Sequence, residues 1–479
     1  TLSSSSAASD VYKRQVLAGL MIARELPVFA QDKTGLPDYP FTLGVASGDP
    51  SPDGVVLWTR LAPNPVSLDP KVPGGFNSDR SVAVGWEVAS DPNFRNIVQK
   101  GNALAARAFA HSIHVELRGL KPSTFYWYRF KAGQWISPAG RTKTAPSQGA
   151  KVNQFKFAFV SCADYQNGYF TAYRDIAAQD LDLVVHLGDY IYEYGPSAPT
   201  FDANRKHNPS FGGPSDIVNN SQMTSLEDYR NRHALYRTDP DLQKAHAAHP
   251  WVVTFDDHEV ENNYADDIDE IGDIRGGYAS SPADFLIQRA NAYRAYYEHM
   301  PIRQSSIPIG PDIQIYRRLS FGSLATFHVL DTRQYRTDQP LGTDGGLGFT
   351  NSDFSITDSE GTNPTGTLLG DTQEQWLTTG LAQSQTTWNI LANQVMMARF
   401  NFLPKVLNPS LPNLFNFDQW DGYATARQRL LDVFAANISK NVVVITGDIH
   451  SSWVHDLKAS FANPRSTTVG PELICTSIT

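Results

Sequence analysis

The stretch "LDLVVHLGDYIYEYG", residues 181–195, joins a short apolar, β-branched run to a glycine and an aspartate. The run is typical of a buried strand, and Gly188 allows a tight backbone turn after it. Asp189 is thereby placed at the carboxyl end of the strand. Active sites of layered α/β folds gather at such ends.

The same pattern recurs along the chain, in apolar runs that break into polar residues at their C-terminal ends. Helix candidates lie between these runs at 372–385 and 425–439, where the apolar spacing is helical. Alternation of strands and helices predicts an α/β layered core. The further runs are "FKFAFVSC" (155–162), "HPWVVTFDDHE" (249–259), "LATFHVLDTRQYR" (324–336), "TTWNILANQVM" (386–396) and "NVVVITGDIH" (441–450). Residues 340–371 and 402–420 are turn-rich and are interpreted as long loops.

Residues 41–146 have a different pattern, which predicts an all-β unit. The stretches 81–90 and 111–120 alternate apolar and polar residues, the period of a half-buried strand. A later strand carries Tyr126 and Tyr128, which we interpret as core packing. The series resembles a fibronectin-type or immunoglobulin-like sandwich.

We therefore predict an N-terminal β-sandwich domain at 36–147 and a catalytic domain at 153–479. Residues 16–31, "VLAGLMIARELPVFAQ", resemble the apolar part and cleavage site of an export signal. Residues 1–31 are interpreted as a leader remnant with a foreign-looking start. We expect a secreted or periplasmic protein.

The composition excludes several classes of protein. The net charge is −9 and no basic tract occurs, so no nucleic-acid-binding surface is predicted. No stretch of the folded region is long and apolar enough to span a membrane. The two cysteines permit at most one disulfide, Cys162–Cys475. We expect a monomer that acts on small molecules.

Many polar residues stand at the predicted strand ends. One such residue would indicate only a turn or a cap, but a convergent set would repel or stay unpaired without a cation among its members. Carboxylate, imidazole and thiolate together suit a transition metal, with harder ions beside it where oxygen dominates. The set comprises Cys162, Asp189, Tyr192, Asp257, His258, Glu259, Asp331, Arg333, Asn393, Gln394, Asp448 and His450.

Two of these motifs allow a more detailed interpretation. Asp189 is placed to bridge two metal ions, and Tyr192 is either a phenolate ligand of ferric iron or ordinary packing. In "FDDHEVENNYADD" (255–267), Asp257 would bind a metal and His258 would face the substrate. The candidates for a hard cation such as calcium are Glu259, Glu261, Asn262 and Asn263, each of which alone would more often be a loop or capping residue.

The order Gly-Asp-x-x-Tyr, x-Asp-His-Glu and Gly-x-x-His resembles the calcineurin-like metallophosphoesterases, especially the purple acid phosphatases. The exact sequences of four motifs are more similar to those of the PhoD-type alkaline phosphatases. These motifs are "GDYIYE", "DDHEVENNYADD", "DTRQYR" and "GDIHSSW". The resemblance covers nearly all of 41–479. It implies an α/β (α+β) core of two packed β-sheets flanked by helices, preceded by the sandwich. It also implies a site with one Fe³⁺ and two Ca²⁺ ions.

The resemblance also implies roles for individual residues. Asp189 would bridge iron and calcium, and His258 would contact the phosphate or the leaving group. Arg333 would be a phosphate clamp, or a surface salt-bridge partner. The iron side would comprise Cys162, Asp189, Tyr192 and His450, and the calcium side Asp257, Asn262 and Asp448.

The implied activity is phosphate-ester hydrolysis, with attack on phosphorus by a metal-activated water or oxo group. A phosphodiesterase or phospholipase of the same architecture is the first alternative. A secreted binding module without catalysis, and a cysteine hydrolase with Cys162 as nucleophile, are the others. Members of the family usually continue beyond "GPELICTSIT", so we expect a truncated C-terminus. The twin-arginine pair common in their leaders is absent here, and the foreign-looking start is interpreted as its replacement.

Overall fold

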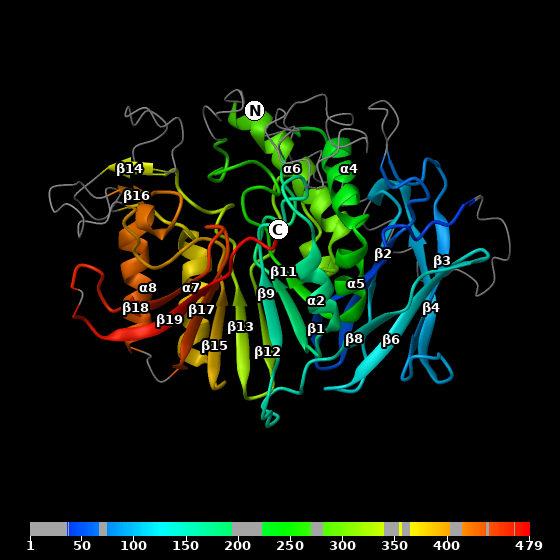
Figure 1. Cartoon of the computed structure of the whole chain (residues 1–479), viewed down its shortest axis with the longest axis horizontal. Coiled ribbons are helices and arrows are strands. Elements are labelled where there is room, and N and C mark those ends of the chain that lie inside the picture. Colours follow the sequence, from blue (N-terminus) through cyan, green and yellow to red (C-terminus); the bar gives the residue numbers. More distant parts are fainter. Residues whose placement is uncertain are drawn as a thin grey trace.

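The computed structural model describes residues 36, 38–66, 74–193, 223–269, 281–339, 354–356, 365–402, 414–436, 440–463 and 465–479. The strands in these ranges form two six-stranded sheets, a five-stranded sheet and a two-stranded ladder (Figure 1). The interpretation of residues 1–31 as a leader falls outside the described residues.

The first six-stranded sheet has the order β5-β2-β1-β11-β10-β9. Strands β1, β11, β10 and β9 are mutually parallel, whereas β2 and β5 are antiparallel to their neighbours. In sheet order the strands span Ser112–Glu116, Gly54–Arg60, Val45–Ser51, Pro250–Val253, Leu183–His186 and Phe157–Val160.

The second six-stranded sheet has the order β12-β13-β15-β17-β19-β18. Its four inner strands are parallel, and both edge strands are antiparallel to their neighbours. In sheet order the strands span Arg317–Phe321, Ala325–Val329, Trp388–Ala392, Val442–Thr446, Thr468–Ile474 and Trp453–Lys458. Every apolar run predicted to be a strand beyond residue 155 is therefore confirmed.

The N-terminal region contributes to two sheets that share one core. Its five-stranded sheet contains β4, β3, β6, β7 and β8. Tyr126 and Tyr128 of β6 are buried against β1, β2 and β5, as their packing interpretation predicted. The five strands span, in that order, Ile97–Ala105, Val82–Ala89, Phe125–Ala132, Trp135–Ile136 and Gly140–Lys143.

One sheet crosses the expected boundary between the two regions. Ser47 of β1 pairs in parallel with Pro250 of β11, so the N-terminal strands extend the first sheet of the core. The sequence led us to expect a sandwich that precedes the core. In the structure, one sheet contains strands from both regions. The domain bounds 36–147 and 153–479 and the immunoglobulin-like type stay predictions.

The core is layered as helices, sheet, sheet and helices (Figure 1). Phe327 of β13 and Val185 of β10 belong to one apolar cluster that joins the two six-stranded sheets face to face. The helices α2, α4, α5 and α6 cover the first sheet, and α7 and α8 cover the second. They span Thr171–Ala178, Leu226–Arg237, Pro240–Ala248, Pro282–His299, Gly370–Gln383 and Ala424–Ala436. The helices predicted at 372–385 and 425–439 correspond to α7 and α8.

Helix starts follow from local sequence. Ser225 accepts a hydrogen bond from the Asp228 backbone N–H at the start of α4, and Asp228 reciprocates, so the pair forms a capping box. Asp239 and Ser281 cap α5 and α6, each followed by a proline in the first turn.

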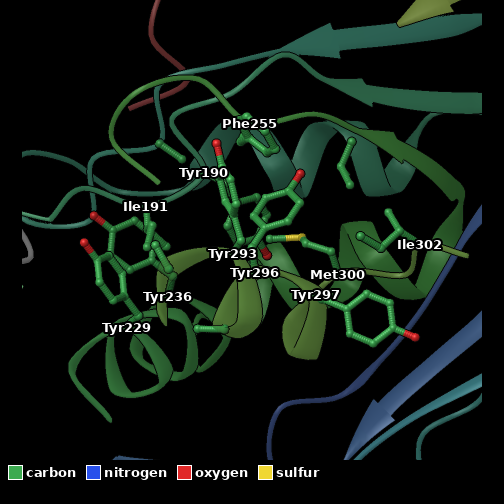
Figure 2. Close-up of a cluster of buried hydrophobic side chains, with 14 of the residues drawn as sticks. Tyr190, Ile191, Tyr229, Tyr236, Phe255, Tyr293, Tyr296, Tyr297, Met300 and Ile302 are labelled. Atoms are coloured by element: carbon green, nitrogen blue, oxygen red, sulfur yellow. The ribbon is translucent and has the colours of Figure 1, made fainter. Parts of the chain in front are cut away.

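Aromatic residues dominate the layer between the first sheet and its helices. Figure 2 shows Tyr293 and Tyr296 of α6 packed beside Phe255, which follows β11. The Phe255 and Tyr293 ring centroids are 4.8 Å apart. This buried aromatic layer includes Tyr190 and Phe255, which belong to the loops that leave β10 and β11.

Smaller elements complete the described chain. Strands β14 (Phe354–Ile356) and β16 (Leu414–Asn416) pair antiparallel, so the stretches interpreted as loops at 340–371 and 402–420 contain a short ladder. The 3₁₀ helices are η1 (Arg107–Phe109), η3 (Gln304–Ser306) and η4 (Trp420–Tyr423). Within the described residues, no helix has both the length and the apolarity that a bilayer crossing requires.

Candidate metal centre

The strand ends of both six-stranded sheets bring the predicted residues together. Among the described residues, three groups of side chains each have ligand atoms that lie within 4.8 Å of one another. Asp189 belongs to all three of these groups. Its position between two metal ions stays a prediction. The groups are Cys162 with Asp189 and His450, Asp189 with Asp257 and His258, and Asp189 with Asp256, Asp257 and Asp448.

Four of these residues have a left-handed backbone. The φ angles are 59° at Cys162, 53° at Asp189, 64° at Asp448 and 54° at His450. This region is sparsely populated by residues other than glycine, and each instance costs of order 1–3 kcal/mol. Such strain clusters at functional sites, where the surrounding structure holds it in place.

The two glycines that precede the aspartates allow close packing at the strand ends, within the first sheet at Gly188 and between the two sheets at Gly447. Gly188 has φ +117°, and a β-carbon there would lie 2.5 Å from the β-carbon of Asp256. A β-carbon on Gly447 would lie 2.4 Å from Oγ of Ser161. Close packing around the site therefore requires glycine at both positions.

The predicted iron side is assembled around the Tyr192 hydroxyl. Its oxygen lies 3.0 Å from Nε2 of His450 and 3.3 Å from Oδ2 of Asp189. Tyr192 is buried, whereas His450 is exposed at the rim. The Cys162 thiol is fully buried and donates to Ser161 Oγ at 3.1 Å. Ligand atoms of Cys162, Asp189 and His450 lie within 4.8 Å of one another, and the Tyr192 hydroxyl contacts the last two of these residues.

Burial disfavours the charged form of these ligands. It raises the pKa of the Cys162 thiol well above its ordinary value, and Asp189 and Asp448 add to this effect. Burial likewise raises the pKa of Tyr192, with Asp189 as the next cause. A thiol in this setting is a poor nucleophile by itself, which counts against the cysteine-hydrolase alternative.

The predicted calcium side is a cluster of buried carboxylates. Among the described residues, Oδ1 of Asp189, Oδ2 of Asp256 and Oδ1 of Asp257 have no hydrogen-bond partner. Burial and the neighbouring carboxylates raise the pKa of Asp189 well above its usual range and that of Asp448 to about 7. Buried oxygens without hydrogen-bond partners, in a cluster where Asp189 and Asp448 resist ionisation, fit divalent cations, which would stabilise the charged forms.

Arg333 does not have the position expected of a phosphate clamp. Its side chain is fully buried, and its Nη1 and Nη2 atoms donate to the two oxygens of Asp418 at 2.8 Å each. Its Nε donates to Asp256 at 2.6 Å, and Nη2 lies 3.4 Å from Oδ1 of Asp257. Because these carboxylates occupy the guanidinium, both the clamp and the surface-pair expectations are corrected to a buried positioning role.

Arg333 sets the charge of its neighbour. Burial opposes ionisation of Asp257, but the Arg333 guanidinium and His258 hold the pKa of that carboxyl well below its usual range. Asp257 also accepts a 2.8 Å hydrogen bond from the Asn263 backbone. Asp257 is therefore present as a carboxylate, and its role as a metal ligand stays a prediction.

His258 is held by residues of the first motif. Its Nδ1 lies 2.8 Å from Oε2 of Glu193, and its ring centroid is 4.2 Å from that of Tyr192. Although burial opposes the positive charge, Glu193, Asp257 and Asp189 raise the pKa of His258 well above its ordinary value. Asn262 lies in the same loop, and its backbone N–H donates to Glu193 at 2.9 Å.

Several residues from the predicted set have structural partners instead. Glu259 accepts hydrogen bonds from the backbone of Asp189, Tyr190 and Asp256, and so fixes two strand ends. Asp331 accepts from the backbone of Arg333 and Gln334. The Asn393 side chain donates hydrogen bonds to Val395 and Thr446. The Gln394 side chain donates to Thr254 and Leu330.

Sequence reasoning missed four residues of the site. Asp256 is the first aspartate of "FDDHE", so the doubled carboxylate was a usable signal. Glu193 lies inside "GDYIYE" and was a usable signal for the same reason. Asp418 and Gln419 lie in a stretch interpreted as a loop, and Gln419 donates to Oδ2 of Asp448 at 2.5 Å. No local pattern marks these two.

The two cysteines do not form a disulfide bond. Cys162 and Cys475 are both free thiols, so the one possible disulfide is absent. Cys475 is half-buried, and its sulfur lies 3.4 Å from Oγ of Ser161. Cys162 therefore remains available as a ligand.

Comparisons with known proteins identify similar chains. A family model described as "PhoD-like phosphatase" matches residues 157–479, and one described as "PhoD-like phosphatase, N-terminal domain" matches 29–146. The protein "Alkaline phosphatase D" of Bacillus subtilis (strain 168) is 48% identical over 463 residues, which are 96% of this chain and 73% of that protein. A solved structure described as "Structure of PhoD" superposes with a TM-score of 0.82 at 48% identity, covering 93% of this chain and 79% of that one.

Proposed function

The chain belongs to the PhoD-like phosphatase family, and from that premise we propose that its buried cluster around Asp189 is the metal centre of a phosphate-ester hydrolase. The family and the relative at 48% identity identify the chain as an enzyme that hydrolyses phosphate esters. The proposal concerns which residues hold the metals and what the other side chains do.

Cys162, Tyr192, His450 and Asp189 would hold Fe³⁺. The mixture of thiolate, phenolate and imidazole suits a transition metal. Asp189 would also reach a Ca²⁺ pair held by Asp257, Asp448 and the Asn262 side chain. Asp256 has one oxygen without a hydrogen-bond partner and is a further candidate. Oxygen-only surroundings suit calcium.

When bound, the metal ions would supply Lewis acidity toward the phosphoryl oxygens and acidify a water molecule for attack on phosphorus. The chain's own residues would prepare the site. Arg333 keeps Asp257 ionised and fixes Asp256 and Asp418. His258 lies beside the Asp189 and Asp257 carboxylates, where it would hold a proton near the ester oxygen.

One observation carries this proposal. Asp189 is the single residue common to all three ligand groups among the described residues, and one of its oxygens has no hydrogen-bond partner. Loss of its charge would remove the link between the iron and calcium sides.

The test compares the wild type with Asp189→Asn on p-nitrophenyl phosphate, before and after treatment with a metal chelator. We expect the chelator to abolish wild-type turnover, and Asp189→Asn to lose both turnover and bound metal. Wild-type turnover that survives complete removal of metal would overturn the proposal. Bis-p-nitrophenyl phosphate, assayed in parallel, decides between monoester and diester preference.

We also propose that the protein is exported and acts as a monomer on small phosphate esters. The support for export is the apolar stretch 16–31, which resembles a signal sequence. Cell fractionation of the native host and gel filtration of the purified chain test the two statements. Recovery in the cytosol, or elution as an oligomer, would contradict them.

A further inference from the structure

Glu193 is a buried carboxylate to which no role in the reaction has been assigned. Its side chain is fully buried, and it directly follows Tyr192. A carboxylate is costly to bury unless hydrogen bonds satisfy its oxygens. Both oxygens are satisfied here, and both partners belong to the loop after β11.

The two hydrogen bonds tie separate parts of the site to one side chain. Oε2 lies 2.8 Å from Nδ1 of His258, and Oε1 accepts from the Asn262 backbone N–H at 2.9 Å. Glu193 therefore connects the proposed substrate-side histidine to the backbone of a proposed calcium ligand. The first motif, "GDYIYE", thus reaches across to the second, "DDHEVENN".

The His258 ring has a fixed orientation. The Tyr192 ring packs against it at a centroid distance of 4.2 Å, while Glu193 holds its Nδ1 edge. The Nε2 edge consequently faces away from Glu193. A nitrogen of the same ring lies within 4.8 Å of carboxylate oxygens of Asp189 and Asp257. A carboxylate that accepts from Nδ1–H fixes the orientation of the ring, and the imidazolium form of the ring carries its second hydrogen on Nε2.

We propose that Glu193 is a positioning residue that holds His258 so that its Nε2–H is directed at the leaving oxygen of the ester. This inference rests on the proposed function, in which His258 holds a proton near that oxygen. As the P–O bond breaks, its electron pair goes to the leaving oxygen, which takes the Nε2 proton and departs as an alcohol. Water supplies the oxygen added to phosphorus, and a proton from water returns to His258.

The test uses two substrates that differ in their need for a proton. Phenyl phosphate has a poor leaving group, whereas 2,4-dinitrophenyl phosphate has a good one that departs as an anion. Glu193→Gln keeps the size of the side chain but removes its charge. We expect kcat to fall roughly 10- to 100-fold on phenyl phosphate and less than about threefold on 2,4-dinitrophenyl phosphate. Bound metal should stay at the wild-type level.

Two further variants make the result specific. In a His258→Ala background, Glu193→Gln should cause little further loss on either ester. Glu298→Gln is the matched control, because Glu298 is also fully buried and is paired with Arg230 rather than with His258. It should leave the ratio of the two kcat values unchanged. If Glu193→Gln does not fold, Glu193→Asp replaces it in the test. The aspartate side chain is one methylene shorter, so its oxygens lie farther from His258.

The possible outcomes distinguish the role of Glu193 from the proposed role of His258. Unequal losses for His258→Ala, with equal losses for Glu193→Gln, would overturn the role of Glu193 and leave that of His258 intact. Equal losses for His258→Ala would overturn both. Loss of metal from Glu193→Gln would also contradict the inference, since it would assign Glu193 to the metal sites.

Discussion

The Tyr192 hydroxyl lies 3.0 Å from Nε2 of His450, although 258 residues separate the two in the chain. Tyr192 follows β10 of the first sheet, and His450 follows β17 of the second. Their contact therefore depends on the face-to-face packing of the two sheets. It places a phenol and an imidazole where one metal ion would bind both.

Replacement of Tyr192 by Phe tests this placement spectroscopically. A phenolate bound to Fe³⁺ gives a visible charge-transfer absorption, which Tyr192→Phe should abolish. Tyr190→Phe is the control, since the Tyr190 hydroxyl contacts His246 at 2.9 Å instead of the site. A visible band that survives in the Tyr192 variant would remove this residue from the ligand set.

Replacement of Gly188 by Ala should destabilise the fold. The added β-carbon would meet Asp256 at 2.5 Å at φ +117°, so strain and overpacking combine to roughly 2–5 kcal/mol. Gly149→Ala is the control, because Gly149 has φ +73° but open space around it, and it should cost about 1–2 kcal/mol. Urea unfolding measures both free energies. Equal losses would mean that the approach to Asp256 is not tight.

Replacement of Arg333 by Gln should cost about 3–5 kcal/mol of unfolding free energy, because it leaves buried carboxylates without their partner. Arg429 also makes a two-pronged contact with a carboxylate, that of Glu374, but it does so near the surface. Arg429→Gln should therefore change stability by about 0–1 kcal/mol. Similar values for the two variants would refute the buried positioning role.

Acid should destabilise the protein through one buried histidine, His328. His328 is fully buried, and its Nδ1 accepts from Arg318 Nε at 3.1 Å. Burial lowers the pKa of His328 to about 4, from an ordinary value near 6.5. The unfolded chain takes up the proton first as the pH falls, so stability is lost between about pH 6.5 and pH 4 and levels off below.

The contribution of His328 to this loss is of order 1–3 kcal/mol. His328→Gln should make unfolding free energies less dependent on pH across that range. A pH dependence as steep as that of the wild type would show that this histidine does not titrate as described.

The sequence predicts well what depends on local pattern. The run "NVVVITGDIH" contains both the buried strand β17 and the two site residues Asp448 and His450. Gly188 and Gly447 are informative for the same reason, because close packing after a strand excludes other residues. Site residues that directly follow a strand can be predicted, because their place in the sequence puts them at the end of that strand.

The sequence predicts poorly what depends on contacts between distant segments. Asp418 binds Arg333 across 85 residues, and its surroundings are typical of a loop. Ser47 pairs with Pro250 although the two lie in regions expected to be separate. Arg333 itself was misassigned because its carboxylate partners come from two other segments. Contacts between distant segments produce no periodic pattern in the sequence.

The proposed metal centre depends most directly on the sulfur of Cys162. Cys162→Ala and Cys475→Ala remove the two thiols one at a time, and only the first belongs to a ligand group. The decisive measurement is elemental analysis of iron and calcium in the purified wild type and both variants. Iron should be present in the wild type and in Cys475→Ala and largely lost from Cys162→Ala, along with turnover of p-nitrophenyl phosphate. Full retention of iron and turnover in Cys162→Ala would contradict the proposed centre.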